Sequence, residues 1–143
     1  MIICIDFDGT IHDGVWPGIG EPMPGAKEAI NNLRAEGHYV IIWTCREGVQ
    51  QTEMINWLLA QGIGFDRVND HEPRNLAMYG SDSRKVYAHV YIDDKNVGGL
   101  PSWGEIALLV RRRIWLCFIR MVFPYTLRQA ATHTRIGYDC TKS

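Results

Sequence analysis

Short apolar runs alternate with amphipathic stretches along most of this chain. Four runs have the length and composition of buried strands: about 2–6, 38–43, 65–68 and a stretch within 86–92. Three stretches carry apolar residues at helical spacing: about 24–36, 49–61 and 103–120. The segments 11–23 and 69–82, which are rich in glycine, proline or polar residues, are predicted to be loops.

The first two predicted helices have clear boundary signals. Pro24 is suited to the first turn of the first helix, and Gly37 and Gly62 follow the last periodic positions as C-caps. Each helix is therefore expected to pack one face on a sheet. The expected core positions are Ala26, Ala29, Ile30 and Leu33 on the first helix, and Val49, Met54, Ile55, Leu58 and Leu59 on the second.

Strands that alternate with helices indicate a parallel sheet with helices on both faces. We expect a single-domain, Rossmann-like α/β core over residues 1–123, with its chemical motifs in 1–105 and a C-terminal helix at about 103–123. Residues 124–143 are expected to form a basic tail. In such sheets the ligand site lies beyond the carboxyl ends of the strands, so polar residues that follow strands are the functional candidates.

Charge is unevenly distributed along the chain. The 15 Lys/Arg and 16 Asp/Glu residues give a net charge of −1. Residues 1–105 hold 8 basic and 15 acidic residues (−7), whereas residues 106–143 hold 7 basic residues and one acidic residue (+6). The acidic first part disfavours a nucleic-acid groove there, and the basic end leaves nucleic-acid contact open.

The four cysteines (Cys4, Cys45, Cys117 and Cys140) are scattered, without a C-x-x-C pair. This pattern favours free thiols in a reducing compartment over disulfides or a zinc site, and we predict a cytoplasmic protein. No apolar stretch approaches the ~20 residues needed to span a bilayer. The N-terminus begins directly with strand-like sequence, so no secretory signal is expected.

The first apolar run ends in Asp6-Phe7-Asp8-Gly9-Thr10. Residues i and i+2 of a strand point the same way, so Asp6 and Asp8 are expected to share one side. Two acids so placed repel unless a cation lies with them. Gly9 allows a tight turn whose backbone N–H groups can form an anion-binding concavity. Together these features indicate phosphoryl chemistry; a surface turn after a strand is the plain alternative.

Other polar residues follow or precede the later strands. Thr44 and the pair Asp93-Asp94 come after predicted strands, and Lys85 comes before one. Each alone has a structural explanation. Thr44 could simply end a strand, Asp93-Asp94 could begin a turn, and Lys85 could be a solvated charge. Their joint order favours one site assembled from distant segments.

That order resembles the haloacid dehalogenase-like superfamily of phosphotransferases, over about residues 1–105. Asp6-Phe7-Asp8-Gly9-Thr10 is similar to its first motif, Thr44 to its second, Lys85 to its third and Asp93-Asp94 to its fourth. The stretch 92–104 resembles a small, capless branch of hydrolase-like proteins. By resemblance, dehalogenases lack an acid two residues after the nucleophile, so Asp8 favours phosphate transfer over carbon–halogen hydrolysis.

The resemblance implies a Mg²⁺-dependent phosphomonoester hydrolase. Asp6 would be the nucleophile that forms an aspartyl-phosphate, and Asp8 the general acid and then base. Mg²⁺ would be held by the Asp6 side chain, the Asp8 backbone carbonyl and Asp93, with Asp94 close by. Thr44 and Lys85 would assist catalysis. The implied phosphate- or substrate-binding positions are Phe7, Gly9, Thr44, Arg46 and Lys85; for Arg46 a solvent-facing role is an equal alternative.

The spacing of the motifs leaves no room for a cap domain. The 37 residues between Asp6 and Thr44 and the 48 between Thr44 and Asp93 are consumed by predicted elements, whereas a further domain needs ~50 or more. The site is therefore expected to be open. Trp16 and Ile19 in the 11–23 loop either form a small flap over it or pack the loop on the core.

The expected partner is a phosphorylated substrate, either a small molecule or a macromolecular end such as that of a nucleic acid. The apolar and basic segment 106–143 favours a helix docked on the core or on a second copy of the chain, with membrane-surface or nucleic-acid contact as alternatives. A rival function from another class is a receiver-like signalling module that accepts phosphate on aspartate without turnover.

Overall fold

The computed structural model describes the backbone of residues 1–122 and the side chains of residues 1–113. In chain order the elements are β1 (Ile2–Ile5), α1 (Ala26–Ala35), β2 (Tyr39–Ile42), α2 (Gly48–Gln61), β3 (Arg67–Val68), α3 (Pro73–Tyr79), β4 (Val90–Ile92) and α4 (Trp103–Val122). Residues 1–107 form one compact unit and residues 108–143 a second. The sheet and every predicted motif lie in the first unit.

The four strands form one parallel sheet in the order β3-β2-β1-β4. Ile5 at the end of β1 is in register with Ile42 on one side and Ile92 on the other. The carboxyl ends of β1, β2 and β4 therefore reach the same edge of the sheet. The predicted α/β class with a parallel sheet is confirmed.

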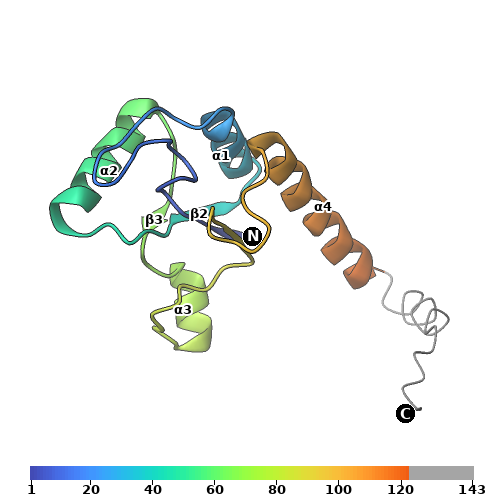
Figure 1. Cartoon of the computed structure of the whole chain (residues 1–143). Coiled ribbons are helices and arrows are strands. Elements are labelled where there is room, and N and C mark those ends of the chain that lie inside the picture. The colour runs from blue at the N-terminus through green and yellow to red at the C-terminus, as the bar shows by residue number, and fades with distance from the viewer. Residues whose placement is uncertain (123–143) are drawn as a thin grey trace, which may run out of the picture. The chain divides into compact units, whose positions relative to one another are not determined.

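Helices lie on both sides of this sheet (Figure 1). The connections through α1 and α2 step in one direction across the sheet, from β1 to β2 to β3, and the connection through α3 steps back to β4. Because parallel crossovers are right-handed, reversal of direction puts the connecting helix on the opposite face. Figure 1 accordingly shows α1 and α2 above the strands and α3 below them.

The core forms where the strands and helices turn apolar side chains toward each other. The strands β1 and β2 are buried almost throughout, and the predicted stripe of α1 (Ala26, Ala29, Ile30 and Leu33) is buried as expected. On α2 the buried face is narrower than predicted. Met54 and Leu58 are buried, but Val49 and Leu59 are 69% and 64% exposed, because only one side of this helix meets the core.

Two predicted boundaries are wrong. Pro24 lies in the turn before α1, since the helix begins at Ala26 after Gly25 in a left-handed conformation. The segment 69–82 is not wholly a loop, because it contains α3. The Glu72 carboxylate accepts a hydrogen bond from Asn75 N–H (2.6 Å) and Gly80 caps the other end. No residue of α3 is buried, so apolar periodicity gave no sign of it.

Cys4 and Cys45 are free thiols, as predicted, and burial raises the pKa of Cys4 to about 12. Among the residues that the structure describes, no helix combines the length and the apolar character needed to cross a membrane. The predicted tail, residues 124–143, lies outside the described residues. Docking of the last helix on the core or on a second copy stays a prediction.

Candidate active site

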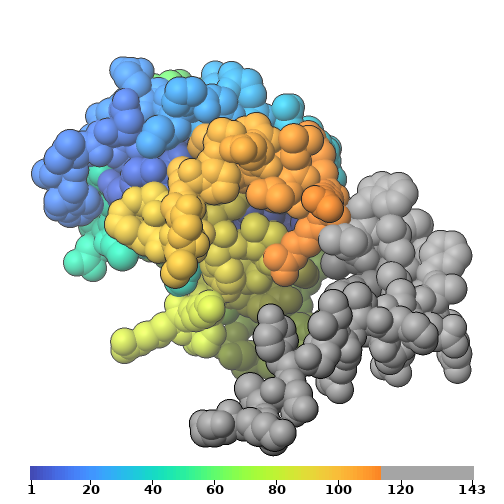
Figure 2. Space-filling view, turned by 45° about the vertical axis from the view of Figure 1, so that its right-hand side comes forward, coloured from blue at the N-terminus to red at the C-terminus, as the bar shows by residue number. Residues whose placement is uncertain are grey.

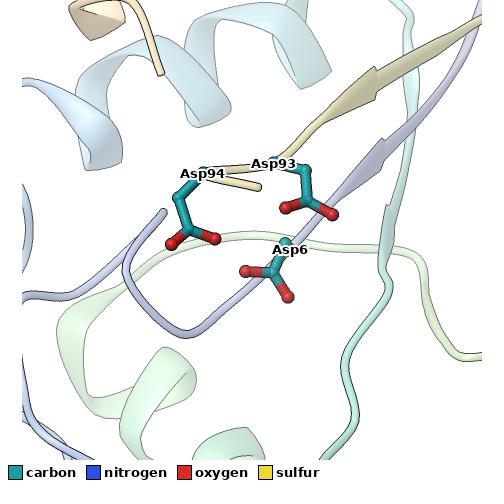
Figure 3. A group of neighbouring side chains, drawn as sticks. All are labelled: Asp6, Asp93 and Asp94. Atoms are coloured by element: carbon teal, nitrogen blue, oxygen red, sulfur yellow. The ribbon is translucent and has the colours of Figure 1, made fainter. Parts of the chain in front are cut away.

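Three aspartates gather at the carboxyl edge of the sheet. Asp6 directly follows β1, and Asp93 and Asp94 directly follow β4. Figure 3 shows the three carboxylates turned toward one another. One oxygen from each lies within 4.8 Å of the others, and all three residues are half-buried. The prediction that Asp6 and the pair Asp93-Asp94 lie together is therefore confirmed; Thr44 is not part of this group.

The crowding of these acids is visible in the pKa of Asp6. Burial raises it most, the charge of Asp93 adds to the rise and Asp94 contributes less. Hydrogen bonds from the backbone of Phe7 and the hydroxyl of Thr10 oppose the rise, yet the pKa reaches about 7. A cation among the three carboxylates would remove this repulsion and keep Asp6 ionised at neutral pH.

The donor set suits a hard divalent cation. Two oxygens that bind one Mg²⁺ at about 2.1 Å lie at most about 4.2 Å apart, so the 4.8 Å limit between these oxygens requires only a small closure. Partly exposed carboxylates also leave room for the water ligands that Mg²⁺ retains. The residues present therefore fit the predicted ion.

Thr10 ties the aspartate group together. Its hydroxyl donates to Asp6 Oδ2 (3.2 Å) and accepts from the backbone N–H of Asp94 (3.0 Å). Its own carbonyl accepts from the indole N–H of Trp103 at the start of α4 (3.1 Å). The residue is fully buried. In Figure 2 the segments from the chain start (blue) and from about residues 93–107 (gold to orange) meet on one face.

Gly9 is required at its position for two reasons. Its φ is +76°, a conformation that L side chains rarely adopt. A Cβ built on it would also lie 2.9 Å from Asp94 Oδ2 and 3.2 Å from Asp94 Cγ. The bare backbone lets the first loop pass directly beside the aspartate group.

Asp8 does not join these aspartates, although the sequence suggested a shared side. Its carboxylate accepts hydrogen bonds from Arg46 Nε (3.0 Å) and Nη2 (2.6 Å), and from His12 Nε2 (3.1 Å). The strand ends at Ile5, so the i, i+2 rule for strands no longer applies at Asp8. The cation that accompanies Asp8 is a side chain of the protein.

These contacts lower the pKa of Asp8. Burial alone would raise it, but the hydrogen bonds from Arg46 and His12 and the charge of Arg46 outweigh burial. The His12 ring has a defined role in this network. Its Nδ1 accepts from the N–H groups of Gly14 and Gly20 (2.9 and 3.2 Å), so Nε2 carries the proton that is donated to Asp8.

Arg46 is only 1% exposed, so the solvent-facing alternative is wrong. Besides Asp8, its guanidinium donates to the carbonyls of Pro17 and Gly18 (both 3.0 Å). It lies between the rings of Phe7 (5.1 Å) and Trp16 (4.9 Å). The 11–23 loop is thus tied to Asp8 through Arg46, and the half-exposed Trp16 packs on the guanidinium.

Phe7, a predicted substrate-binding position, has a fully buried ring against His12 and Trp57. Only its backbone can reach a ligand. Thr44 is buried and has its backbone clamped by Asn69, which accepts from Thr44 N–H and donates to the Thr44 carbonyl (both 2.8 Å). The Thr44 hydroxyl accepts from Arg46 N–H (3.1 Å), and a hydroxyl in this role can still donate its own proton.

The lysine expected at the site, Lys85, is not the one that pairs with the aspartates. Lys85 lies over the ring of Tyr91, with Nζ 5.0 Å from its centroid. Within residues 1–113 no ion pair joins it to Asp6, Asp93 or Asp94. Lys95 instead forms an ion pair with Asp94. The hydrogen bond to Asp94 raises the pKa of Lys95, and charges of all three aspartates add to the rise.

Sequence reasoning missed His12, Asn69 and Lys95. His12 lies four residues after Asp8 and Lys95 directly follows Asp94, so proximity along the chain was an available signal for both. Asn69 gave no such signal, since it meets Thr44 only because β3 pairs with β2.

A solved structure is similar to this chain over most of its length. It is that of a conserved protein from Bacteroides thetaiotaomicron, with 42% sequence identity and a TM-score of 0.71. The match covers 79% of this chain and 91% of that one. The chain therefore belongs to the same family as this conserved protein. No protein-family model and no curated protein matches the chain.

Proposed function

We propose that this protein is a Mg²⁺-dependent phosphomonoester hydrolase of the haloacid dehalogenase-like type. The observation that carries the proposal is the convergence of Asp6, Asp93 and Asp94 at one edge of a parallel sheet, with oxygens within 4.8 Å of one another. The motif order and the buried Thr44 hydroxyl beside this edge support it.

Asp6 is the nucleophile in this proposal. Its carboxylate attacks phosphorus, the bond to the leaving oxygen breaks, and an aspartyl-phosphate forms. Water then attacks this intermediate, releases inorganic phosphate and restores the carboxylate. Asp6, Asp93 and Asp94 are the residues that would hold Mg²⁺, and the ion would supply positive charge opposite the phosphoryl oxygens and favour the ionised form of Asp6. Thr44 donates its hydroxyl proton to a phosphoryl oxygen.

The contacts of Asp8 favour one of its two implied roles. Arg46 and His12 hold it as an anion, so it is ready to accept a proton from the attacking water. Donation to the leaving group in the first step requires a protonated Asp8, which both partners oppose. Substrates with good leaving groups are therefore expected to react fastest.

Within residues 1–113, Lys95 is the lysine that forms an ion pair with one of these aspartates, and in this proposal it takes the charge-neutralising role that the resemblance implied for Lys85. Its side chain is 81% exposed, so it can move from Asp94 to an arriving phosphate. A receiver-like module and a nucleic-acid-end phosphatase remain alternatives, to be separated by experiment.

The test is a phosphate-ester panel that includes aryl phosphates, sugar phosphates and terminally phosphorylated oligonucleotides, assayed once with Mg²⁺ and once with EDTA. Asp6→Asn should lose at least about 10³-fold in kcat. Asp13→Asn is the matched control, because Asp13 is an exposed aspartate in the loop that follows the Asp6 motif. This variant should leave kcat unchanged.

Each outcome has a distinct meaning. Metal-dependent turnover that disappears in Asp6→Asn supports the hydrolase. A stoichiometric, long-lived phosphoryl adduct without turnover would favour the receiver, and activity confined to oligonucleotides would favour the nucleic-acid phosphatase. Turnover that persists in Asp6→Asn would show that Asp6 is not the nucleophile.

A further inference from the structure

A cavity of about 680 Å³ lies between α3 and the chain that leads into β4. It shares no lining residue with the aspartate group. We propose that this cavity binds a small aromatic anion. Its volume is within the range of about 300–1,000 Å³ typical of small-molecule sites. The residues on which the proposal rests are His71, Asn75, Tyr79, Lys85, Tyr87 and Tyr91.

Three tyrosine rings supply the aromatic part of the site. Tyr79 on α3 is 70% exposed and Tyr87 is 45% exposed, so both rings have free surface beside the cavity. Tyr91 of β4 completes the set from the sheet. Tyrosine rings bind planar ligands by stacking and edge contacts, which suits a ligand with one aromatic ring system.

The charge of the lining selects for an anion. No aspartate or glutamate is among the residues that line the cavity, and Lys85 is its cation. His71 adds no charge in the observed network, because Nδ1 accepts from Tyr87 N–H (3.3 Å) and Nε2 donates to the Ser83 carbonyl (2.9 Å). The Lys85 ammonium lies over the Tyr91 ring and is free of any ion pair within residues 1–113.

The wall of the cavity is held in place without a ligand. The Tyr91 hydroxyl donates to the Val86 carbonyl (2.7 Å) and accepts from Ala88 N–H (3.1 Å). Together with His71, which is 4% exposed, it fixes the segment 83–88 by bonds from side chain to backbone. Because these side chains are already ordered, ligand binding loses little free energy in ordering the site.

The test compares two probes in NMR titrations of the full chain: 2-naphthoate, an aromatic anion, and 2-naphthalenemethanol, its neutral analogue. Lys85→Met should weaken naphthoate binding about tenfold and change the affinity for the alcohol less than about twofold. Arg84→Met is the matched control, since this neighbouring exposed cation does not line the cavity. Tyr87→Leu should weaken both probes about threefold.

The site is also independent of the proposed catalysis, so Asp6→Asn should bind naphthoate as the wild type does. Unchanged naphthoate affinity in Lys85→Met would overturn the proposal, as would equal losses in Lys85→Met and Arg84→Met. Loss of binding in Asp6→Asn would assign the probe to the aspartate edge instead. Circular dichroism of each variant confirms that the fold is intact, and a failed phosphatase assay leaves this result unaffected.

Discussion

Side chains at the carboxyl edge of the sheet are divided into two groups by a single turn. Asp6 faces Asp93 and Asp94, whereas Asp8, two residues on, is bound by Arg46 and His12. Their pKa values consequently move in opposite directions. Carboxylates with such different environments are suited to different tasks in one reaction. The residue that allows this division is Gly9, which lets the chain turn against Asp94.

Replacement of Gly9 by alanine should destabilise the protein by about 2–3 kcal/mol. A positive φ strains any L residue, and the added Cβ would also meet Asp94 Oδ2 at 2.9 Å. Gly37→Ala is the matched control, because Gly37 has φ +84° with nothing within 4 Å of its Cβ position. It should cost only about 1 kcal/mol. Urea denaturation measures both; equal losses would mean that the close approach to Asp94 is unimportant.

Elements follow the sequence pattern where burial enforces it and depart from it where burial is absent. The strands β1 and β2 are short apolar runs and α1 carries apolar residues at helical spacing, and each was predicted to within about two residues. The helix α3 has no buried residue, so only its capping signals, Glu72-Pro73 and Gly80, marked it. The strand β3 is reduced to Arg67–Val68 and is held partly by side chains.

One such side chain is Asp66, which joins three elements. It accepts from Arg34 of α1 (2.7 Å) and from the N–H of Val40 in β2 (2.7 Å), directly before β3. Burial would raise the pKa of Asp66, but the hydrogen bond from Arg34, the backbone hydrogen bond from Val40 and the charge of Arg34 give a net lowering. These contacts stabilise the fold while Asp66 is ionised.

Asp66→Asn should therefore lower the free energy of unfolding at pH 7 by about 1 kcal/mol. Because the folded-state pKa is depressed, this stabilisation is present above the unfolded-state value near 3.9 and is lost as pH falls through the folded-state value. Between pH 7 and pH 2, the free energy of unfolding of the variant should therefore lack the decrease that protonation of Asp66 causes in the wild type. Asp70→Asn tests an exposed pair with Arg67 and should change stability by less than about 0.5 kcal/mol; a loss as large as that of Asp66→Asn would count against the assignment.

At the scale of the whole molecule, the fold concentrates negative charge at one edge of the sheet. The backbone hydrogen bond from Asp6 to Ile92 (2.9 Å) and the side-chain bonds of Thr10 leave the aspartates little freedom to separate. The protein therefore folds against repulsion that a bound cation would relieve. Stability and metal binding should be coupled through these three residues.

Mg²⁺ at ten times its Kd should raise the free energy of unfolding by about 1.4 kcal/mol, or the Tm by roughly 4 °C for a chain of this size. In EDTA at pH 7, Asp93→Asn should be more stable than the wild type by about 1 kcal/mol, because one repelling charge is removed. It should also lose the response to Mg²⁺. Thermal unfolding with and without Mg²⁺ measures both effects.

Asp82→Asn is the control, since Asp82 is an exposed acid outside the group and should leave the response to Mg²⁺ intact. A destabilised Asp93→Asn protein in EDTA would show that the aspartates are not in mutual repulsion. If the Tm of the wild type does not change when Mg²⁺ is added, the predicted Mg²⁺ site is contradicted.

The sequence by itself determined the order of the four strands and of helices α1, α2 and α4, the parallel α/β class and the strand-end positions of Asp6, Thr44 and Asp93. These properties depend on periodicity and on local turn chemistry, which neighbours along the chain encode. Only the tertiary structure decided that Asp8 is bound by Arg46, that Lys95 rather than Lys85 meets the aspartates, and that Asn69 clamps Thr44. Those contacts join residues up to 38 positions apart or depend on side-chain direction, and no local pattern specifies which of several nearby charges comes to lie against which carboxylate.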